Sequence, residues 1–446
     1  MQQTNRSRHR HMTSFQVISL GFLSVILLGS LLLMLPIATK SGQCTSFLDA
    51  LFTATSAVCV TGLVVNDTAT YWSLFGQGVI LLLIQIGGMG IITIAIAIAV
   101  VSGRKIGLMQ RSTMQEAISA PTVGGIVRRT QFIIRTTIFI EIIGAALLAP
   151  VFCRDFGFWK GIWYSLFHSI SAFCNAGFDL IGIRTPFSSL TSYSVQPIVN
   201  LVIMALIVAG GIGFLTWEDI KIHKWHFKKY KMQSKVIFMV TGILIFLPAL
   251  YFFYFEFSNV PLTERVWVSL FQSVTPRTAG FNTADLTLLS EVGQMLIIIL
   301  MLIGGSPGST AGGMKTTTLA VLVSSALSVF RKKEHTNFFG RQIPDDTIRN
   351  AATIFLMYIV LFLVGGMVIS RTEDIPLMTA LFETASAIGT VGLSLGITPD
   401  LGLVSHIILI CLMFFGRVGG LTLIFATISE KKSNGSKYPQ EKITVG

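Results

Sequence analysis

Four short segments of the chain carry residues whose types and spacing suit the binding of a desolvated cation. Each segment contains a Leu-Phe pair and reaches, ten or eleven residues after the leucine, a glycine followed by an apolar residue. The leucine and glycine positions are Leu51 and Gly62, Leu166 and Gly177, Leu270 and Gly280, and Leu381 and Gly392. Backbone carbonyl oxygens can replace the hydration shell of a cation, and glycine adopts positive φ at little cost, which lets successive carbonyls face one way. The four segments therefore predict one carbonyl-lined cation site.

The residues that approach each glycine are the predicted ion-binding strands, which span 58–62, 173–177, 276–280 and 388–392. The candidate site residues are Val58, Cys59, Val60, Thr61 and Gly62; Phe173, Cys174, Asn175, Ala176 and Gly177; Arg277, Thr278, Ala279 and Gly280; and Gly389, Thr390, Val391 and Gly392. The part upstream of each strand predicts a short helix, whose partially negative C-terminal end favours a cation. One such glycine could simply cap a helix, but four in register favour the ion site.

The composition places these segments in a membrane protein. Charged residues make up 12% of the chain and hydrophobic residues 52%, whereas about 25% charged residues is usual for soluble domains. Apolar runs near 20 residues recur, as a bilayer core of about 30 Å requires of a helix. The predicted fold is an all-α integral membrane protein with eight transmembrane helices. The predicted spans are 15–36, 78–102, 130–152, 196–216, 236–256, 292–304 continuing to 330, 350–369 and 403–428.

The semi-polar segments lie between the members of each pair of spans and are too short to cross. Non-helical backbone at membrane depth is tolerated only where it is buried in protein or lines water, so we expect four re-entrant pore loops. A glycine cluster recurs in the second span of each pair. Four helix–pore–helix repeats can close around one pseudo-fourfold axis, and internal repetition points to a transport path. The predicted repeats are 1–104, 105–222, 223–335 and 336–430, followed by a cytoplasmic tail, 431–446.

The net charge of +12 could suggest a nucleic-acid partner, but the cations cluster between apolar runs and read as topology signals instead. Under the eight-span count the clusters all fall on one side. They lie at 6–10, 104–129, 221–235, 331–349 and 431–442. The positive-inside bias therefore predicts a multi-pass protein of the cell membrane with both termini in the cytoplasm.

The third pair of spans contains a predicted gate. Five glycines and a proline interrupt its second helix, which they cannot comfortably continue. The gate residues are Gly304, Gly305, Ser306, Pro307, Gly308, Ser309, Thr310, Ala311, Gly312, Gly313 and Lys315. Arg417 lies within the last span, where a charge is costly and is by default a functional hypothesis. We expect Arg417 to face a cavity below the ion site and to bond the gate carbonyls. The alternative for the glycine-rich interruption is a static kink, and the alternative for Arg417 is a purely structural tie to a neighbouring helix.

The repeated pore segments, the four glycines and the run Gly416-Arg417-Val418-Gly419-Gly420 resemble the Trk/Ktr/HKT superfamily of potassium transporters, most closely the Ktr-type membrane subunit. The resemblance covers nearly the whole chain. It implies K+ bound at filter carbonyls, an intramembrane gating loop, a homodimer of pore subunits and a cytoplasmic ring of nucleotide-binding RCK-type subunits. The nucleotide would be held by that partner, with no covalently bound cofactor on this chain. Members with Ser at the first filter position conduct sodium, so Gly62 favours potassium, with a possible Na+ dependence.

Three functions are compatible with a membrane protein of this kind: channel-like uptake, a sodium- or proton-coupled symporter that uses Glu141, and a membrane enzyme. An enzyme needs converging His, Asp or Ser groups, and the second spans offer Gly and Thr instead. The stretch from Gly308 to Thr316 nearly spells a phosphate-binding loop, but Met314 is one residue too many and no βαβ context surrounds it. Further polar residues are assigned supporting roles: His168, Gln272 and Glu383 brace the pore helices, and Asp179 and Asn282 lie at the outer mouth.

Overall fold

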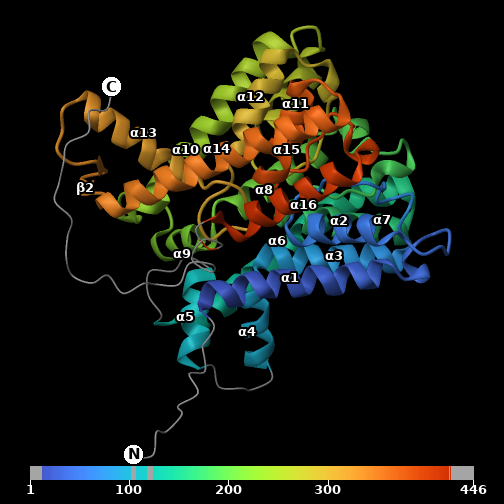
Figure 1. The fold of residues 1–446 in the computed structure, drawn as a ribbon, viewed down its shortest axis with the longest axis horizontal. Coiled ribbons are helices and arrows are strands. Elements are labelled where there is room, and N and C mark those ends of the chain that lie inside the picture. The colour runs from blue at the N-terminus through green and yellow to red at the C-terminus, as the bar shows by residue number, and fades with distance from the viewer. Residues whose placement is uncertain (1–12, 102–106, 118–123, 421, 423–446) are drawn as a thin grey trace, which may run out of the picture.

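The computed structural model describes residues 13–101, 107–117, 124–420 and 422, so the predicted tail lies outside the described residues. Its described part is predominantly helical (Figure 1). Within the described ranges, four helices are long and apolar enough to cross a membrane on their own: α1 (Ser14–Leu33), α6 (Ile126–Phe156), α10 (Met232–Tyr251) with its π-helical extension η5 (Phe252–Glu256), and α14 (Asp345–Glu373). They are the first members of the four predicted pairs of spans.

A short helix follows each long one and packs against it. These short helices are α2 (Phe47–Val58), α7 (Phe158–Phe173), α11 (Leu262–Val274) and α15 (Leu377–Gly389). At 1.5 Å per residue, the 12 residues of α2 extend only about 18 Å, too little to cross the bilayer core. The phenylalanine of every Leu-Phe pair is fully buried, which explains why the pattern repeats; the four are Phe52, Phe167, Phe271 and Phe382.

The second helix of each pair is broken. These helices are α3 (Leu74–Met89), α8 (Pro197–Gly211), α12 (Glu291–Leu302) and α16 (Leu403–Val418). The first three are followed by α4 (Ile91–Val101), α9 (Phe214–His223) and α13 (Thr316–Phe330). The axes of α8 and α9 meet at 96°, and α4 turns steeply away from α3 in Figure 1.

The prediction of continuous spans over 78–102, 196–216 and 403–428 was therefore wrong. A single glycine in the left-handed region stands at each break: Gly90 (φ 85°), Gly213 (φ 89°) and Gly419 (φ 88°). This conformation ends the helical hydrogen-bond pattern, and glycine adopts it without a steric penalty. The same break places Arg417 in the last turn of α16 rather than in the interior of a continuous helix.

The remaining elements connect these helices. They are α5 (Leu108–Ala117), an antiparallel hairpin of β1 (Asn337–Phe338) and β2 (Arg341–Gln342), and the 3-10 turns η1 (Pro36–Ala38), η2 (Ile181–Ile183), η3 (Thr191–Tyr193), η4 (Phe227–Lys229), η6 (Leu286–Leu288) and η7 (Thr398–Asp400).

The helix contacts form a closed cycle. The broken helix of each unit packs on the short helix of the next: α3 on α7, α8 on α11, and α12 on α15. The last broken helix, α16, returns to the first short helix, α2. The short helices are thus enclosed in the middle of the molecule, and the long helices lie around them.

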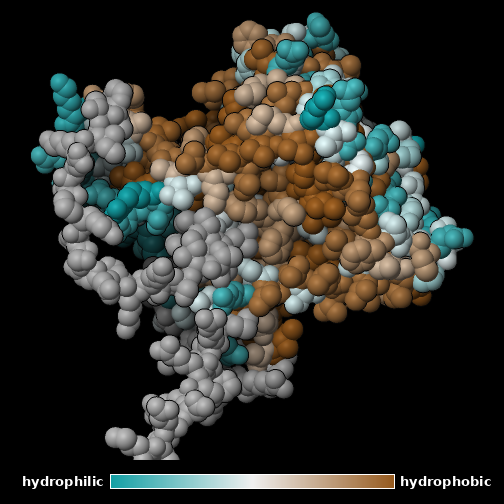
Figure 2. Space-filling model, in the orientation of Figure 1, coloured by the Kyte–Doolittle hydropathy of each residue, from teal (hydrophilic) through white to brown (hydrophobic). Residues whose placement is uncertain are grey.

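The outer surface of this assembly is apolar. In Figure 2 a hydrophobic surface crosses the middle of the visible face, and hydrophilic residues gather toward its two ends. Each of the four long helices exposes large apolar side chains, for example Leu28, Phe139, Phe246 and Leu356. An exposed apolar surface of this extent is suited to contact with lipid rather than with water.

Gly161 sets the packing distance between α6 and α7. A Cβ atom built on Gly161 would lie 2.4 Å from Cys153 Cα, which is backbone and cannot rotate away. The two helices therefore approach as closely as they do because residue 161 has no side chain.

We expect Gly161→Ala to lower the stability of the purified protein by about 1–3 kcal/mol, the usual cost of overpacking, measured as a lower melting temperature in detergent. Gly242→Ala is the matched control, since a Cβ on Gly242 in α10 meets nothing within 4 Å. Equal melting temperatures for the two variants would contradict the assigned α6–α7 contact.

Candidate functional site

The four predicted glycines meet around one centre. A Cβ built on Gly62 would lie 2.5 Å from the carbonyl oxygen of Ala176, the residue before the next glycine in the cycle. The other three glycines stand in the same relation to the next strand. A Cβ on Gly177 would lie 2.7 Å from a carbonyl oxygen of the third strand, one on Gly280 would lie 2.2 Å from a carbonyl oxygen of the fourth, and one on Gly392 would lie 2.2 Å from a carbonyl oxygen of the first. We call these four residues the glycine ring. They jointly line one cavity of about 170 Å³.

Each glycine is required for two reasons. Their φ angles are 92°, 70°, 80° and 92°, in ring order, which is the left-handed region that L-residues with side chains rarely enter. A side chain would also collide with the neighbouring strand, because the atoms it would meet are backbone atoms. A substitution in the ring must therefore displace backbone.

A second left-handed residue stands two positions before each glycine. These residues are Val60 (φ 52°), Asn175 (φ 57°), Thr278 (φ 70°) and Thr390 (φ 51°). Residues other than glycine held there cost on the order of 1–3 kcal/mol, a strain that persists only where surroundings impose it. The alternation turns successive carbonyls of one strand toward the same side. The sequence named these four residues as site residues but did not predict their left-handed conformation, because they share no one residue type that requires it.

Hydroxyl groups at the end of each short helix hold the strands from behind. The amides of Gly62 and Gly392 each donate to a serine Oγ at 3.0 Å, from Ser56 and Ser386. In the other two strands, Ser171 Oγ donates to the Phe178 carbonyl at 2.7 Å and Thr275 Oγ1 to the Phe281 carbonyl at 2.5 Å. The signal was present in the sequence as Ser, Ser, Thr and Ser, five or six residues before the glycines.

The residues after the Leu-Phe pairs were predicted to brace the pore helices; in three units they hydrogen-bond to the segments that follow the strands. His168 Nε2 accepts from the Leu180 amide at 3.3 Å, and Gln272 Nε2 donates to Asn282 Oδ1 at 2.8 Å. Glu383 accepts hydrogen bonds from two hydroxyls of the segment after Gly392, those of Ser394 and Thr398. All three bracing side chains are fully buried. Thr53 occupies this place in the first unit, and its hydroxyl has no hydrogen-bond partner in the described part of the chain.

Polar groups behind the strands differ between units. Behind the second strand, Glu141 accepts from Gln85 Nε2 at 3.2 Å and lies 3.9 Å from Cys174 Sγ. Behind the third strand, the buried Arg277 guanidinium donates to Thr241 Oγ1 at 3.2 Å. Glu141 is thus hydrogen-bonded to neutral neighbours.

The predicted gate is a loop, residues 303–315, beneath the strands. It joins α12 to α13 and is called the third-unit loop below. Thr310 Oγ1 donates to the carbonyl of Phe173 at 2.9 Å, at the inner end of the second strand. The loop amides of Ser306 and Gly313 donate to carbonyls of the second and fourth units, those of Gly211 (2.9 Å) and Gly416 (3.2 Å).

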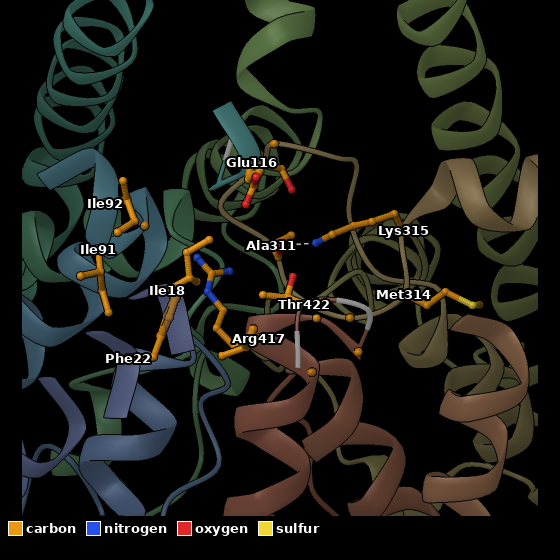
Figure 3. A pocket seen from close by; sticks show the side chains of 18 of the residues that line it. Ile18, Phe22, Ile91, Ile92, Glu116, Ala311, Met314, Lys315, Arg417 and Thr422 are labelled. Carbon is orange, nitrogen blue, oxygen red and sulfur yellow. Dashed lines mark hydrogen bonds between the residues drawn. The ribbon is translucent and has the colours of Figure 1, made fainter. Parts of the chain in front are cut away.

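Two positively charged side chains donate hydrogen bonds to backbone carbonyls of this loop. Arg417 donates to the carbonyls of Thr310 and Gly87, and to that of Gly88 at 3.1 Å. Lys315 Nζ donates to the carbonyls of Ala311 (2.9 Å) and Gly312 (3.2 Å). Figure 3 shows both side chains at the cavity of about 310 Å³ that the loop, α16 and α1 enclose. The lysine is thereby committed to carbonyls of its own loop, which argues against a phosphate-binding role.

The cavity that the glycine ring lines is also lined by the predicted Asp179 and Asn282 and by one acid that we did not predict, Asp67. Asp67 accepts from the amides of Thr70 at 2.8 Å and Phe187 at 3.0 Å. It therefore joins the outer segments of the first two units while it contributes negative charge to the mouth of the cavity.

Comparison with known proteins supplies the family. A family model described as TrkH, cation transport protein, matches residues 1–437. The chain belongs to the TrkH family. Among its TrkH-family relatives, the potassium/sodium uptake protein NtpJ of Enterococcus hirae is 41% identical over 98% of both chains. The Ktr system potassium uptake protein B of Bacillus subtilis is 40% identical over 97% of this chain and 96% of that protein.

A solved structure agrees with the fold. The potassium transporter TrkH from Vibrio parahaemolyticus superposes with a TM-score of 0.74 at 21% identity, covering 95% of this chain and 86% of that one. The resemblance stated from the motifs is confirmed. Membership of the TrkH family makes the chain a multi-pass membrane transporter and not an enzyme.

We expect Ser386→Ala to destabilise the protein by about 1 kcal/mol, because the half-buried amide of Gly392 loses its hydrogen-bond partner; the measurement is thermal unfolding in detergent. Ser24→Ala serves as the control, since Ser24 is exposed and bonds only a carbonyl of its own helix. A melting temperature for Ser386→Ala that matches that of Ser24→Ala would rule out the assigned brace.

Proposed function

We propose that this chain is the ion-translocating subunit of a potassium uptake system, through which K+ passes as in a channel. One observation carries the proposal: four strands from distant parts of the chain bring their glycines and carbonyls around one cavity. Carbonyl rings of this kind replace the hydration shell of a potassium ion. Family membership and the names of the relatives, which refer to potassium uptake, support the same conclusion.

In this proposal the filter consists of strands 58–62, 173–177, 276–280 and 388–392. Glycine at all four ring positions favours potassium over sodium. The left-handed residues before each glycine aim the carbonyls, and the hydroxyl braces behind the strands keep the ring from collapsing onto a smaller ion. The predicted architecture of four helix–pore–helix repeats, eight spans and a pseudo-fourfold axis belongs to the same proposal, which the closed cycle of helix contacts supports.

The third-unit loop and Arg417 form the proposed gate. The loop lies directly below the second filter strand, and the guanidinium of Arg417 bonds it to carbonyls of the first unit. Charge-assisted hydrogen bonds contribute about 1.5–3 kcal/mol each, so the bonds to Arg417 hold the loop across the path. The positive charge additionally opposes a cation in the cavity below.

Both termini are proposed to lie in the cytoplasm, and the pore subunit to work as a homodimer on a ring of nucleotide-binding RCK-type subunits. An inside-negative potential supplies about 2.3 kcal/mol per charge at 100 mV, which corresponds to roughly fifty-fold accumulation.

The alternative is a sodium- or proton-coupled symporter. Its candidate coupling group is Glu141, which is buried among Gln85 and Cys174. Potassium uptake into sodium-free liposomes at fixed pH would favour the channel-like pathway.

Gly62→Ser should reduce the preference for potassium over sodium by about tenfold, which corresponds to about 1.4 kcal/mol, because a side chain there displaces the Ala176 carbonyl. The measurement is competitive ion uptake by transport-deficient cells. Gly42→Ser is the matched control, because Gly42 is also left-handed (φ 69°) but has open space around it. An unaltered preference in Gly62→Ser would assign selectivity to another part of the protein.

Arg417→Ala should raise the potassium flux through reconstituted protein by about tenfold or more, because the third-unit loop loses its tie. Arg417→Lys separates the two roles, since lysine keeps the charge but not the forked geometry of the guanidinium. If the carbonyl bonds close the gate, the lysine variant behaves like the alanine variant; if the charge alone does so, it behaves like the natural protein. Unchanged flux in both variants would refute the gate.

A further inference from the structure

A second polar site lies on α6, away from the filter and the third-unit loop. It is a pocket of about 560 Å³ whose lining comes from the first half of α6 and from α9. Three of its side chains are cations: Arg128, Arg135 and Lys221. Two phenyl rings and two neutral polar side chains complete the lining, which contains no acid. The pocket therefore selects for negative charge.

The cations are arranged on two elements that face each other. Arg128 and Arg135 are seven residues apart, so they lie on one face of α6 about 10 Å apart along its axis. Lys221 reaches over from α9, and its Nζ lies 4.7 Å from the centre of the Phe132 ring, a contact that fixes the ammonium over α6.

Neighbouring acids do not neutralise these three cations. Glu218, also on α9, pairs with a different arginine, Arg129, at 3.4 Å. Within the described ranges, neither arginine of the pocket nor Lys221 forms an ion pair with an acidic side chain. Three positive charges are therefore left to an external anion.

The position along α6 indicates where that anion comes from. The helix has 31 residues and is about 46 Å long, which exceeds the bilayer core of about 30 Å and extends into the headgroup layer. Directly after Arg135 the helix exposes apolar side chains: Ile138 is 47% exposed, Phe139 65% and Ile142 59%. Phe139 also lines the pocket. Along α6, the cationic side chains are thus followed by exposed apolar side chains, in the same order as the headgroup and the acyl chains of a lipid.

We propose that this pocket binds an anionic phospholipid, with the phosphate among Arg128, Arg135 and Lys221 and the acyl chains along Phe139 and Ile142. It lies on the side that we propose to be cytoplasmic, where basic pockets between helices recognise anionic headgroups. A soluble phosphate would use the three cations but gain nothing from the exposed apolar face. The binding site is independent of the potassium pathway.

The test is a titration of the full-length protein in detergent with phosphatidylglycerol and with phosphatidylcholine, read by native mass spectrometry as lipid retained per chain. The triple variant R128Q/R135Q/K221Q should lose about fivefold of its phosphatidylglycerol affinity for each cation removed. The matched control is K228Q/K229Q/K333Q, which removes the same charge from exposed side chains outside the pocket and should retain its affinity within about twofold.

Two further measurements make every outcome decisive. The single variant Lys221→Gln, which changes one exposed side chain, should lose about fivefold even if the triple variant does not fold. Equal losses in the pocket and control variants would overturn the proposal in favour of nonspecific charge attraction. Displacement of phosphatidylglycerol by millimolar inorganic phosphate would overturn it in favour of a soluble anion. Neither readout depends on ion transport, so failure of the proposed potassium function would leave the result unaffected.

Discussion

The need of every buried backbone carbonyl for a partner is the constraint on which this structure depends. In the bilayer core an unsatisfied polar group costs several kcal/mol, yet the four strands at the centre are not helical and leave carbonyls without helix partners. Hydroxyls of the short helices satisfy part of the backbone from behind: Ser171 and Thr275 donate to the carbonyls of Phe178 and Phe281. Below, Arg417 and Lys315 satisfy the third-unit loop. In the proposed function, the carbonyls around the glycine ring are the ones left for K+.

Glycine makes this arrangement geometrically possible outside the ring as well. A Cβ on Gly87 would lie 1.9 Å from the carbonyl oxygen of Val58, and one on Gly210 equally close to that of Phe173. Gly416 stands in the same relation, at 2.1 Å, to the carbonyl of Ile388. The glycine clusters of the second helices are therefore contact points at which each broken helix touches the end of a short helix. In the third unit the glycines lie in the loop, where a Cβ on Gly312 or Gly313 would meet Thr390 or Gly389 of the fourth unit.

Patterns that repeat along the chain made the larger features predictable. The Leu-Phe pairs and ring glycines gave the short helices and their common centre, because burial of a phenyl ring and positive φ each demand a particular residue type. The breaks at Gly90, Gly213 and Gly419 were missed because long apolar runs favour continuous helices and a lone glycine in one is usually tolerated. The left-handed Val60, Asn175, Thr278 and Thr390 could not be read from residue type, since the surrounding protein imposes their conformation. The bonds of Arg417 to Gly87 and Gly88 join residues remote in sequence, which no local pattern encodes.

The closed cycle of contacts has a consequence for how the protein is made. The cycle of helix contacts closes only where α16 meets α2, and Arg417 donates to a carbonyl 330 residues earlier in the chain. A chain that has inserted only its first three units therefore lacks the contact that closes the cycle. Membrane insertion of the final quarter is the step that completes the enclosure of the earlier segments.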